Sequence, residues 1–294
     1  MNKVITILFF CLFAETGFSQ NANPYSNTDK GQVYILWGWN RAYYTKSNIS
    51  FKGDDYNFEL AKVKAHDRPT AFSYHNYLKI DRITIPQTNF RMGYFIKKDL
   101  ALTLGFDHMK YVMDQDQTVK MTGNIDRNGS YKGSYNGDKV LTEDFLTFEH
   151  TDGLNYINVE VEKYMKIYQS ENNKFIVQGL AGGGIGFMMP RTDVKLLDYE
   201  RNDEFHVAGF GLSNKIGLQL TFFKHLVIKL ENKYGYINMP DINLHKKGIN
   251  GTAKQAFFFT AIDGLIGGTF SLNGKKKKSK SIVRIAHTQQ LRKA

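Results

Sequence analysis

The chain has 294 residues, with 39 Lys and Arg against 28 Asp and Glu, so its formal net charge is +11. A hydrophobic content of 42% is too high for a disordered chain, and a mean hydropathy of −0.40 excludes a bundle of transmembrane helices. Residues 274–294 hold eight Lys and Arg and no acidic residue, which leaves +3 for the rest of the chain, so the charge does not indicate a nucleic-acid-binding body.

The amino terminus predicts export. Lys3 precedes an apolar run from Val4 to Ala14, and Gly17 and Ser19 provide small residues before Gln20. This pattern is typical of a secretory signal peptide, and the run is too short for a membrane span. We expect residues 1–19 to be a cleaved signal peptide and residues 20–30 a periplasmic segment. The single cysteine, Cys11, lies within the signal peptide, so the exported chain would lack disulfides.

After residue 20 the dominant hydrophobic period is two residues, which is typical of β-strands. In residues 89–97, for example, Phe90, Met92 and Tyr94 alternate with Arg91 and Gly93. The pattern predicts eight strands, over residues 33–44, 89–97, 100–112, 154–164, 175–187, 205–222, 226–236 and 255–272.

The connections between these strands alternate in length without exception. Residues 45–88 and 113–153 are long and 188–204 and 237–254 intermediate, whereas 98–99, 165–174 and 223–225 are short. Transmembrane β-barrels have short periplasmic turns and longer extracellular loops. The sequence therefore predicts an all-β chain in which residues 31–272 form an eight-stranded antiparallel up-and-down transmembrane β-barrel with long extracellular loops, followed by a basic tail over residues 273–294. The aromatic first loop is expected to form a strand pair or a cap over the barrel mouth. An exported soluble barrel or sandwich is the alternative.

The face opposite the apolar one carries nearly balanced charges. An eight-stranded barrel has an interior only wide enough for side chains, and buried charges are costly unless they pair. We therefore expect a lumen filled by structural ion pairs rather than an open pore, formed by Arg91, Glu160, Glu162, Lys215, Lys229, Glu231, Lys233 and Asp263, with Asp107 on the same face.

In this pattern of strands and loops, residues 31–272 resemble the small outer-membrane barrels of Gram-negative bacteria, the OmpA-transmembrane and OmpX type. The resemblance implies an integral protein of the cell outer membrane, in contact with outer-membrane lipid and lipopolysaccharide. Such barrels commonly end on an aromatic residue, whereas here more than twenty residues follow Phe270.

One polar cluster is a candidate for chemistry. His150, Thr151 and Asp152 precede the fourth predicted strand, and Asp107, His108 and Tyr111 end the third. If the alternation holds, His150, Asp152, Glu160 and Glu162 share one face, and Asp107, Tyr111, His150 and Asp152 converge at the barrel mouth. A His–carboxylate pair can orient a general base for a hydroxyl nucleophile such as Thr151. A structural rim that fixes two loops is the favoured interpretation, because no nucleophile motif is present.

No motif predicts a cofactor or a metal site; the pairs His66–Asp67 and Asp107–His108 lack a complete ligand set. The lysine-rich tail could bind anionic lipid head groups or peptidoglycan. We expect a monomeric, non-enzymatic barrel that acts in binding or envelope stability through its external loops and does not bind nucleic acid. The alternatives are a rim-sited hydrolase or acyl-transfer enzyme acting on lipid A or phospholipid, and a narrow solute channel.

Overall fold

The computed structural model describes residues 26–77, 79, 87–202 and 204–272. The predicted signal peptide and the basic tail lie outside the described residues. The strands are β1 (Gln32–Tyr44), β2 (Ser47–Gly53), β3 (Tyr56–Val63), β4 (Ala65–His66), β5 (Thr88–Lys97), β6 (Leu100–Met113), β7 (Thr118–Ile125), β8 (Gly133–Val140), β9 (Leu146–Gln169), β10 (Phe175–Met188), β11 (Asp193–Leu196), β12 (Gly209–Phe222), β13 (Leu226–Asn243) and β14 (Gly251–Ser271), with one short helix, α1 (Tyr74–Tyr77). Within this part of the chain, no helix is long and apolar enough to cross a membrane.

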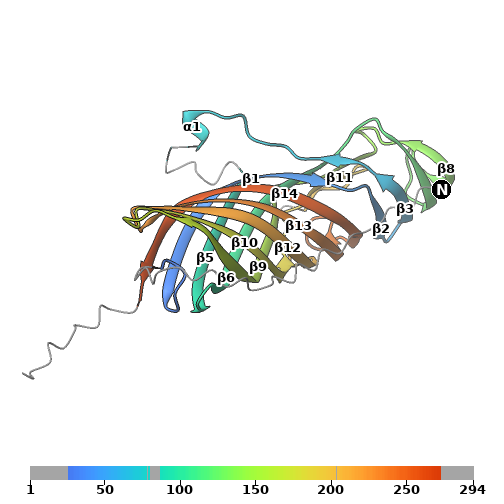
Figure 1. The fold of residues 1–294 in the computed structure, drawn as a ribbon. Coiled ribbons are helices and arrows are strands. Elements are labelled where there is room, and N and C mark those ends of the chain that lie inside the picture. The colour runs from blue at the N-terminus through green and yellow to red at the C-terminus, as the bar shows by residue number, and fades with distance from the viewer. Residues whose placement is uncertain (1–25, 78, 80–86, 203, 273–294) are drawn as a thin grey trace, which may run out of the picture.

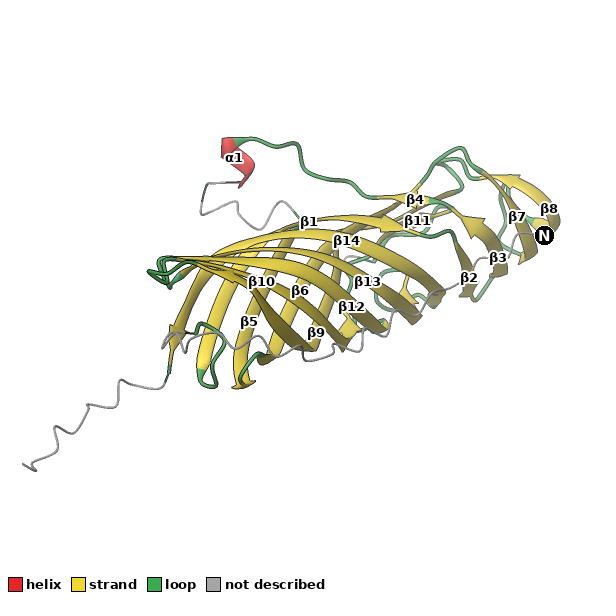
Figure 2. Ribbon diagram, viewed as in Figure 1, coloured by secondary structure: helices red, strands yellow, loops and turns green. Residues whose placement is uncertain are grey.

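Among the described residues, eight strands close into a ring, whose course can be followed in Figures 1 and 2. Each strand pairs antiparallel with its neighbours in the order β1, β5, β6, β9, β10, β12, β13 and β14, and the pairing of β1 with β14 completes the circle. The register is continuous along this seam, from Gln32 opposite Ser271 to Tyr44 opposite Phe259. The predicted eight-stranded up-and-down barrel is therefore confirmed, with predicted and observed strands overlapping throughout.

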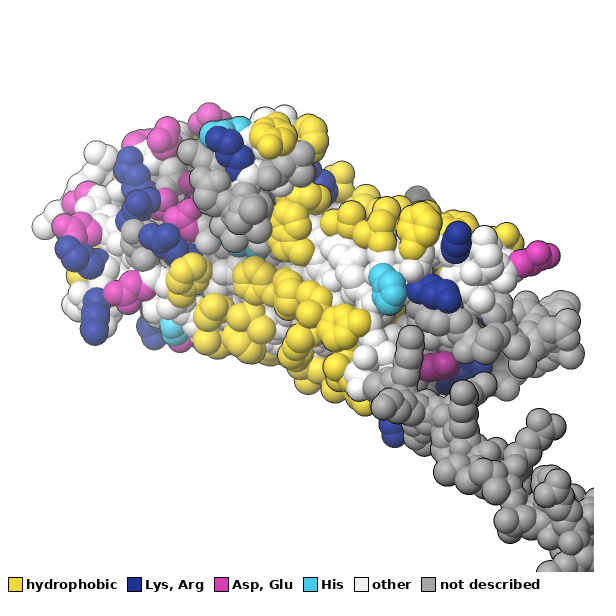
Figure 3. Space-filling view, turned by 90° about the vertical axis from the view of Figure 1, so that its left-hand side faces the viewer, with side chains coloured by type: hydrophobic (Ala, Val, Ile, Leu, Met, Phe, Trp, Pro, Cys, Tyr) yellow, Lys and Arg dark blue, Asp and Glu magenta, His cyan; other side chains and the backbone are white. Residues whose placement is uncertain are grey.

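The barrel wall alternates as the sequence requires, with apolar side chains outward and polar ones inward. On β5, Phe90, Met92 and Tyr94 are exposed while Arg91 is buried. On β14 the outward apolar side chains extend from Phe258 to Phe270, which at about 3.4 Å per residue and a tilt of about 40° corresponds to roughly 30 Å of height. Figure 3 shows hydrophobic side chains gathered in a band on the face of the barrel turned toward the viewer. This exterior has the composition and height of a membrane-facing wall.

Several strands continue past the barrel and build a folded head at the end that carries the long connections (Figure 1). The upper part of β14 pairs with β2, and the sheet runs on through β3 and β7 to β8. The upper part of β9 pairs with β11. The connections predicted over residues 45–88, 113–153 and 188–204 thus contain further strands, and the strand pair expected in the first loop is the β2–β3 hairpin. The hairpin β7–β8 was not predicted.

Two apolar clusters fill the interior above and below its polar middle. The larger cluster lies in the head and the top of the barrel and includes Phe51, Phe58, Phe148 and Tyr156. The smaller cluster, which includes Tyr34 and Phe95, lies toward the tight turns. At this lower end the Asn27 amide donates to Gln178 (2.9 Å) and to Thr221 (2.8 Å), which ties the segment before β1 to β10 and β12. The barrel interior is therefore packed along its length.

Candidate functional site

The middle of the lumen is a layer of paired charges. Arg91 on β5 lies 2.6 Å from Asp107 and 2.9 Å from Asp263, and Lys233 joins Asp107 (2.6 Å) to Glu160 (2.8 Å). The layer comprises four cations and five carboxylates: Arg91, Lys215, Lys229 and Lys233 with Asp107, Glu160, Glu162, Glu231 and Asp263. Each carboxylate has at least one cation within 4 Å, and the four cations leave the layer with a formal net charge of only −1.

Tyrosines hold the lower side of this layer. The Tyr34 hydroxyl donates to Glu162 (2.7 Å) and contacts Thr103 (2.6 Å), and the Lys229 ammonium lies 4.2 Å from the Tyr34 ring centroid. Tyr164 donates a second hydrogen bond to Glu162. The ion-paired side chains are no more than 4% exposed. Side chains therefore occupy the lumen that a channel would need.

The predicted rim cluster is divided between the two sides of the wall. Asp107 belongs to the lumen layer, 2.6 Å from Lys233. Tyr111 and His150 lie together in the head core, with ring centroids 5.7 Å apart. Asp152 is exposed and lies 3.6 Å from Arg191 outside the barrel.

The prediction that His150 and Asp152 share a face is wrong. The pairing of β6 with β9 shifts register between Met109 and Tyr111, and Gly153 on β9 has φ +136°. This bulge rotates the strand, so that His150 is buried and Asp152 points outward. The expected convergence of Asp107, Tyr111, His150 and Asp152 does not occur. The two flanking members of the cluster also lie away from the core: Thr151 is half-buried, and His108 faces outward with its Nδ1 2.9 Å from the Asn155 side-chain oxygen.

His150 lies in the interior of the head, beyond the part of the barrel that carries the apolar band. Its surroundings are unsuited to acid–base catalysis that needs solvent. Its ring is fully buried, with Nδ1 2.9 Å from the Thr192 hydroxyl and Nε2 without a partner among the described atoms. Burial lowers the pKa of His150 to about 4, and burial also raises the pKa of the adjacent Tyr111 to about 12. Both groups are therefore neutral near pH 7 and act as hydrogen-bonding members of a core.

The two members of the His66–Asp67 pair have different partners. His66 contacts Asp114 (2.6 Å), whereas Asp67 accepts hydrogen bonds from the Ala42 amide (3.1 Å) and the Gln87 side chain (2.5 Å). Within the described ranges, no group of three or more His, Cys, Asp or Glu side chains is arranged to hold a metal ion.

The outer end of the head contains a stacked clasp that the sequence did not predict. The Tyr199 ring lies between the Arg127 guanidinium, 3.9 Å from its centroid, and the His245 ring, with centroids 4.1 Å apart. Arg127 also binds Asp55 (3.2 Å) and Asp198 (2.5 Å). Hydrogen bonding to Asp198 raises the pKa of Arg127 further above its usual range. The clasp joins four segments that are far apart in the sequence.

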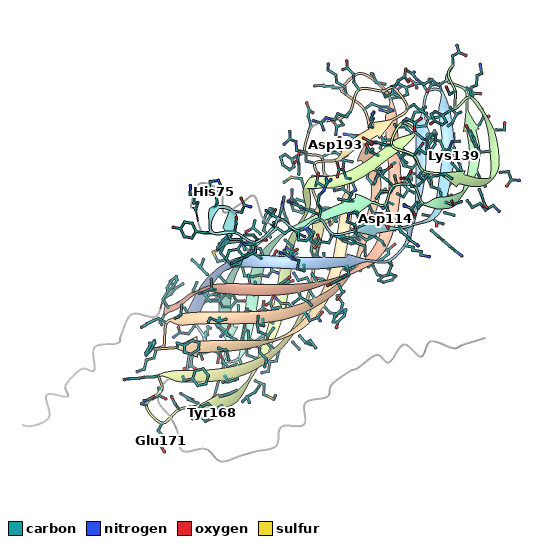
Figure 4. All side chains as sticks on the ribbon, turned by 90° about the horizontal axis from the view of Figure 1, so that it is seen from above. His75, Asp114, Lys139, Tyr168, Glu171 and Asp193 are labelled. Carbon is teal, nitrogen blue, oxygen red and sulfur yellow. The ribbon has the colours of Figure 1, made fainter. Side chains whose placement is uncertain are left out.

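Beside the clasp is a pocket of about 280 Å³, lined among others by Arg127, Tyr131, Asp144 and Leu197. The Tyr131 hydroxyl donates to Asp144, and the Lys139 ammonium lies 4.3 Å from the Tyr131 ring centroid. Figure 4 places Lys139 and Asp193 in this head, at the end of the molecule opposite Glu171. The head therefore offers a polar, aromatic surface on ordered strands.

Comparison with known proteins gives similar folds but no sequence family. No family model matches the chain, and no curated protein matches it. The solved structures that it resembles include the outer membrane protein AlkL in lipid bilayers, at 8% identity over 88% of this chain and 99% of AlkL, with a TM-score of 0.40. OprG of Pseudomonas aeruginosa matches at 13% identity over 83% and 97% with a TM-score of 0.36, and Neisserial surface protein A at 11% over 81% and 99% with a TM-score of 0.33. AlkL and OprG are outer-membrane proteins. The barrel assignment for this chain follows from its own strand pairing.

Proposed function

We propose that this chain is an integral outer-membrane barrel with a closed lumen, which presents a rigid extracellular head for binding or for envelope stability. The observation that carries the proposal is the continuity of the sheet: β9, β13 and β14 belong to the barrel wall and also to the head. A surface built on such strands is held in one conformation before a partner arrives.

The two ends of the molecule differ in the way that this orientation requires. Figure 3 shows mixed positive and negative side chains over the head and a hydrophobic band over the barrel. The tight turns, such as Lys98–Asp99 between β5 and β6, lie at the opposite end. Short turns face the periplasm and larger segments face outward in transmembrane barrels. In this orientation the wall contacts outer-membrane lipid and lipopolysaccharide, and the basic tail would meet anionic lipid head groups or peptidoglycan.

The described geometry supports binding more than the two alternatives. A lipid hydrolase needs a base and a nucleophile within hydrogen-bonding reach, but His150 is buried in the head core while Asp152 lies outside the wall. A solute channel needs an open lumen, and the ion-pair layer occupies it.

Cell-surface labelling tests the proposal. In a Cys11→Ser background, Asn136→Cys on β8 introduces a thiol in the head, and Asn172→Cys introduces one in the β9–β10 turn. A membrane-impermeant maleimide should label position 136 in intact cells and position 172 only after the envelope is disrupted. Fractionation of the unmodified chain with soluble periplasmic proteins, or the reverse labelling pattern, would contradict the proposal.

Two further measurements address the alternatives. Lipid profiles of cells producing the wild type and His150→Ala should be identical, because the barrel is proposed to be non-enzymatic. Planar bilayers containing the purified chain should show no reproducible unitary conductance steps. A changed acyl pattern would favour the enzyme, and stable steps would favour the channel.

A further inference from the structure

An arm over residues 67–77 leaves the rim and lies against the outside of the barrel. It follows β4 and ends with α1, which Figure 1 shows outside the ring beside β1. Figure 4 shows His75 standing to the side of the barrel, away from the head. The arm is therefore placed beside the wall rather than over the mouth, where the sequence suggested a cap.

Hydrogen bonds fix both ends of the arm to the wall. At its start, Asp67 accepts from the Ala42 amide on β1 (3.1 Å). At its end, the buried Tyr77 hydroxyl accepts from Arg41 of β1 (3.1 Å) and donates to the Thr70 carbonyl (2.7 Å). The arm consequently has a set position against the wall.

The arm extends the aromatic surface of the wall. Trp37 and Trp39 point outward from β1 with ring centroids 4.5 Å apart, and Tyr77 lies 5.5 Å from Trp39. Phe72 lies 5.1 Å from Tyr77. The row runs without a break from the apolar band of the barrel to the arm.

The outermost aromatic side chains of the arm are unusually exposed. Phe72 is 82% exposed and Tyr74 is 69% exposed, more than any aromatic side chain of the barrel wall. Water contact over such rings is unfavourable, whereas amphipathic aromatic side chains are enriched where a bilayer meets water. Because the row continues the membrane-facing band, the bilayer that surrounds the barrel is the surface that can cover both rings.

We propose that the arm is an interfacial anchor, which inserts Phe72 and Tyr74 into the outer leaflet beside the barrel. The inference rests on the proposed outer-membrane location and adds a second lipid contact outside the barrel wall. This contact would restrict the rotation and tilt of the barrel relative to the bilayer and would hold the head at a fixed height above the lipid.

Site-specific quenching by lipids tests the anchor. In the Cys11→Ser background, single cysteines at Phe72, Phe258 and Asn136 are labelled with a small environment-sensitive fluorophore, and each protein is reconstituted in phosphatidylcholine vesicles with or without spin-labelled lipid. Position 258 lies in the band and reports membrane insertion, whereas position 136 lies in the head. The label at 72 should be quenched at least half as strongly as the label at 258, and the label at 136 should not be quenched.

The controls separate the two proposals. Quenching at 258 without quenching at 72 would overturn the anchor and leave the barrel in the membrane. Quenching at none of the positions would overturn the membrane location itself. Since a label can perturb the arm, trypsin digestion of label-free vesicles provides a second readout. Phe72→Ser/Tyr74→Ser should be cleaved after Lys79 at least five times faster than the wild type, and equal rates would contradict the anchor.

Discussion

Replacing Arg91 by methionine should strongly destabilise the barrel. Arg91 is the cation that pairs with Asp263, and it also lies within 3.6 Å of Glu231 and 2.6 Å of Asp107. The substitution keeps most of the side-chain volume but changes the formal charge of the lumen layer from −1 to −2. Removal of one partner from a buried ion pair costs about 3–5 kcal/mol, so the free energy of unfolding should fall by this amount.

A compensating substitution should recover much of the loss. In Arg91→Met/Asp263→Asn the formal charge of the layer returns to −1, and each remaining carboxylate keeps a lysine: Asp107 has Lys233 at 2.6 Å, and Glu231 has Lys215 at 3.0 Å. The double variant should therefore lie within about 2 kcal/mol of the wild type, because interacting residues are not additive.

The measurement is urea unfolding in lipid vesicles, followed by tryptophan fluorescence and by heat-modifiable gel mobility. Arg68→Met is the matched control, because Arg68 pairs with Glu149 at 2.8 Å while 60% exposed, and an exposed pair contributes about 0–1 kcal/mol. An Arg91→Met variant within about 1 kcal/mol of the wild type, or a double variant less stable than the single one, would refute the ion-pair reasoning.

Three shorter predictions concern the wall, the head core and the clasp. Gly93→Val should cost about 2 kcal/mol or more in unfolding experiments, because a Cβ there would lie 2.1 Å from the Tyr34 ring, whereas Gly179→Val should be nearly neutral because the nearest atom to its Cβ is 3.4 Å away. Burial lowers the pKa of His150 in the folded chain to about 4, so the unfolded chain takes up this proton first as the pH falls. About 3 kcal/mol of unfolding free energy that is present above pH 6.5 should therefore be lost between pH 6.5 and pH 4. His150→Gln should flatten this pH dependence, and an unchanged slope would contradict the reasoning. Tyr199→Phe removes the hydrogen bond from the Tyr199 hydroxyl to Asp55 in the clasp. It should speed proteolysis of the head several-fold without altering the heat-modifiable mobility of the barrel. Equal rates of proteolysis would show that the hydroxyl does not hold the clasp.

The barrel could be predicted because both faces of its wall restrict which residue types they accept. Lipid requires apolar side chains outward, and a narrow lumen admits few arrangements inward, so residues such as Phe90 and Arg91 must alternate. The same alternation places charges on the inward face of several strands. The alternation cannot decide which charge pairs with which, because partners such as Arg91 and Asp263 are 172 residues apart in the sequence.

The head was largely missed because its strands obey weaker constraints. Strand β8 has the sequence GSYNGDKV and is mostly exposed, so it joins the sheet through backbone pairing with β7 rather than through an apolar face. Strand β9 was predicted to begin at Leu154, whereas it begins at Leu146, since the bulge near Gly153 interrupts the period. The same bulge explains the wrong placement of Asp152. The clasp of Arg127, Tyr199 and His245 leaves no signal in any single segment.

The part of the head next to the barrel should nevertheless fold with the barrel as one cooperative unit, whereas the clasp at the outer end can open separately. Strand β14 runs from Gly251, opposite β2 in the head, to Ser271, opposite β1 at the lower end of the barrel. The larger apolar cluster spans the junction, since Phe51 of the head and Phe259 of the wall belong to it. Loosening the head therefore exposes apolar surface that also closes the top of the barrel. This coupling explains how segments that would be mobile loops on a simpler barrel can form a surface of fixed shape, and it ties that shape to the integrity of the barrel wall.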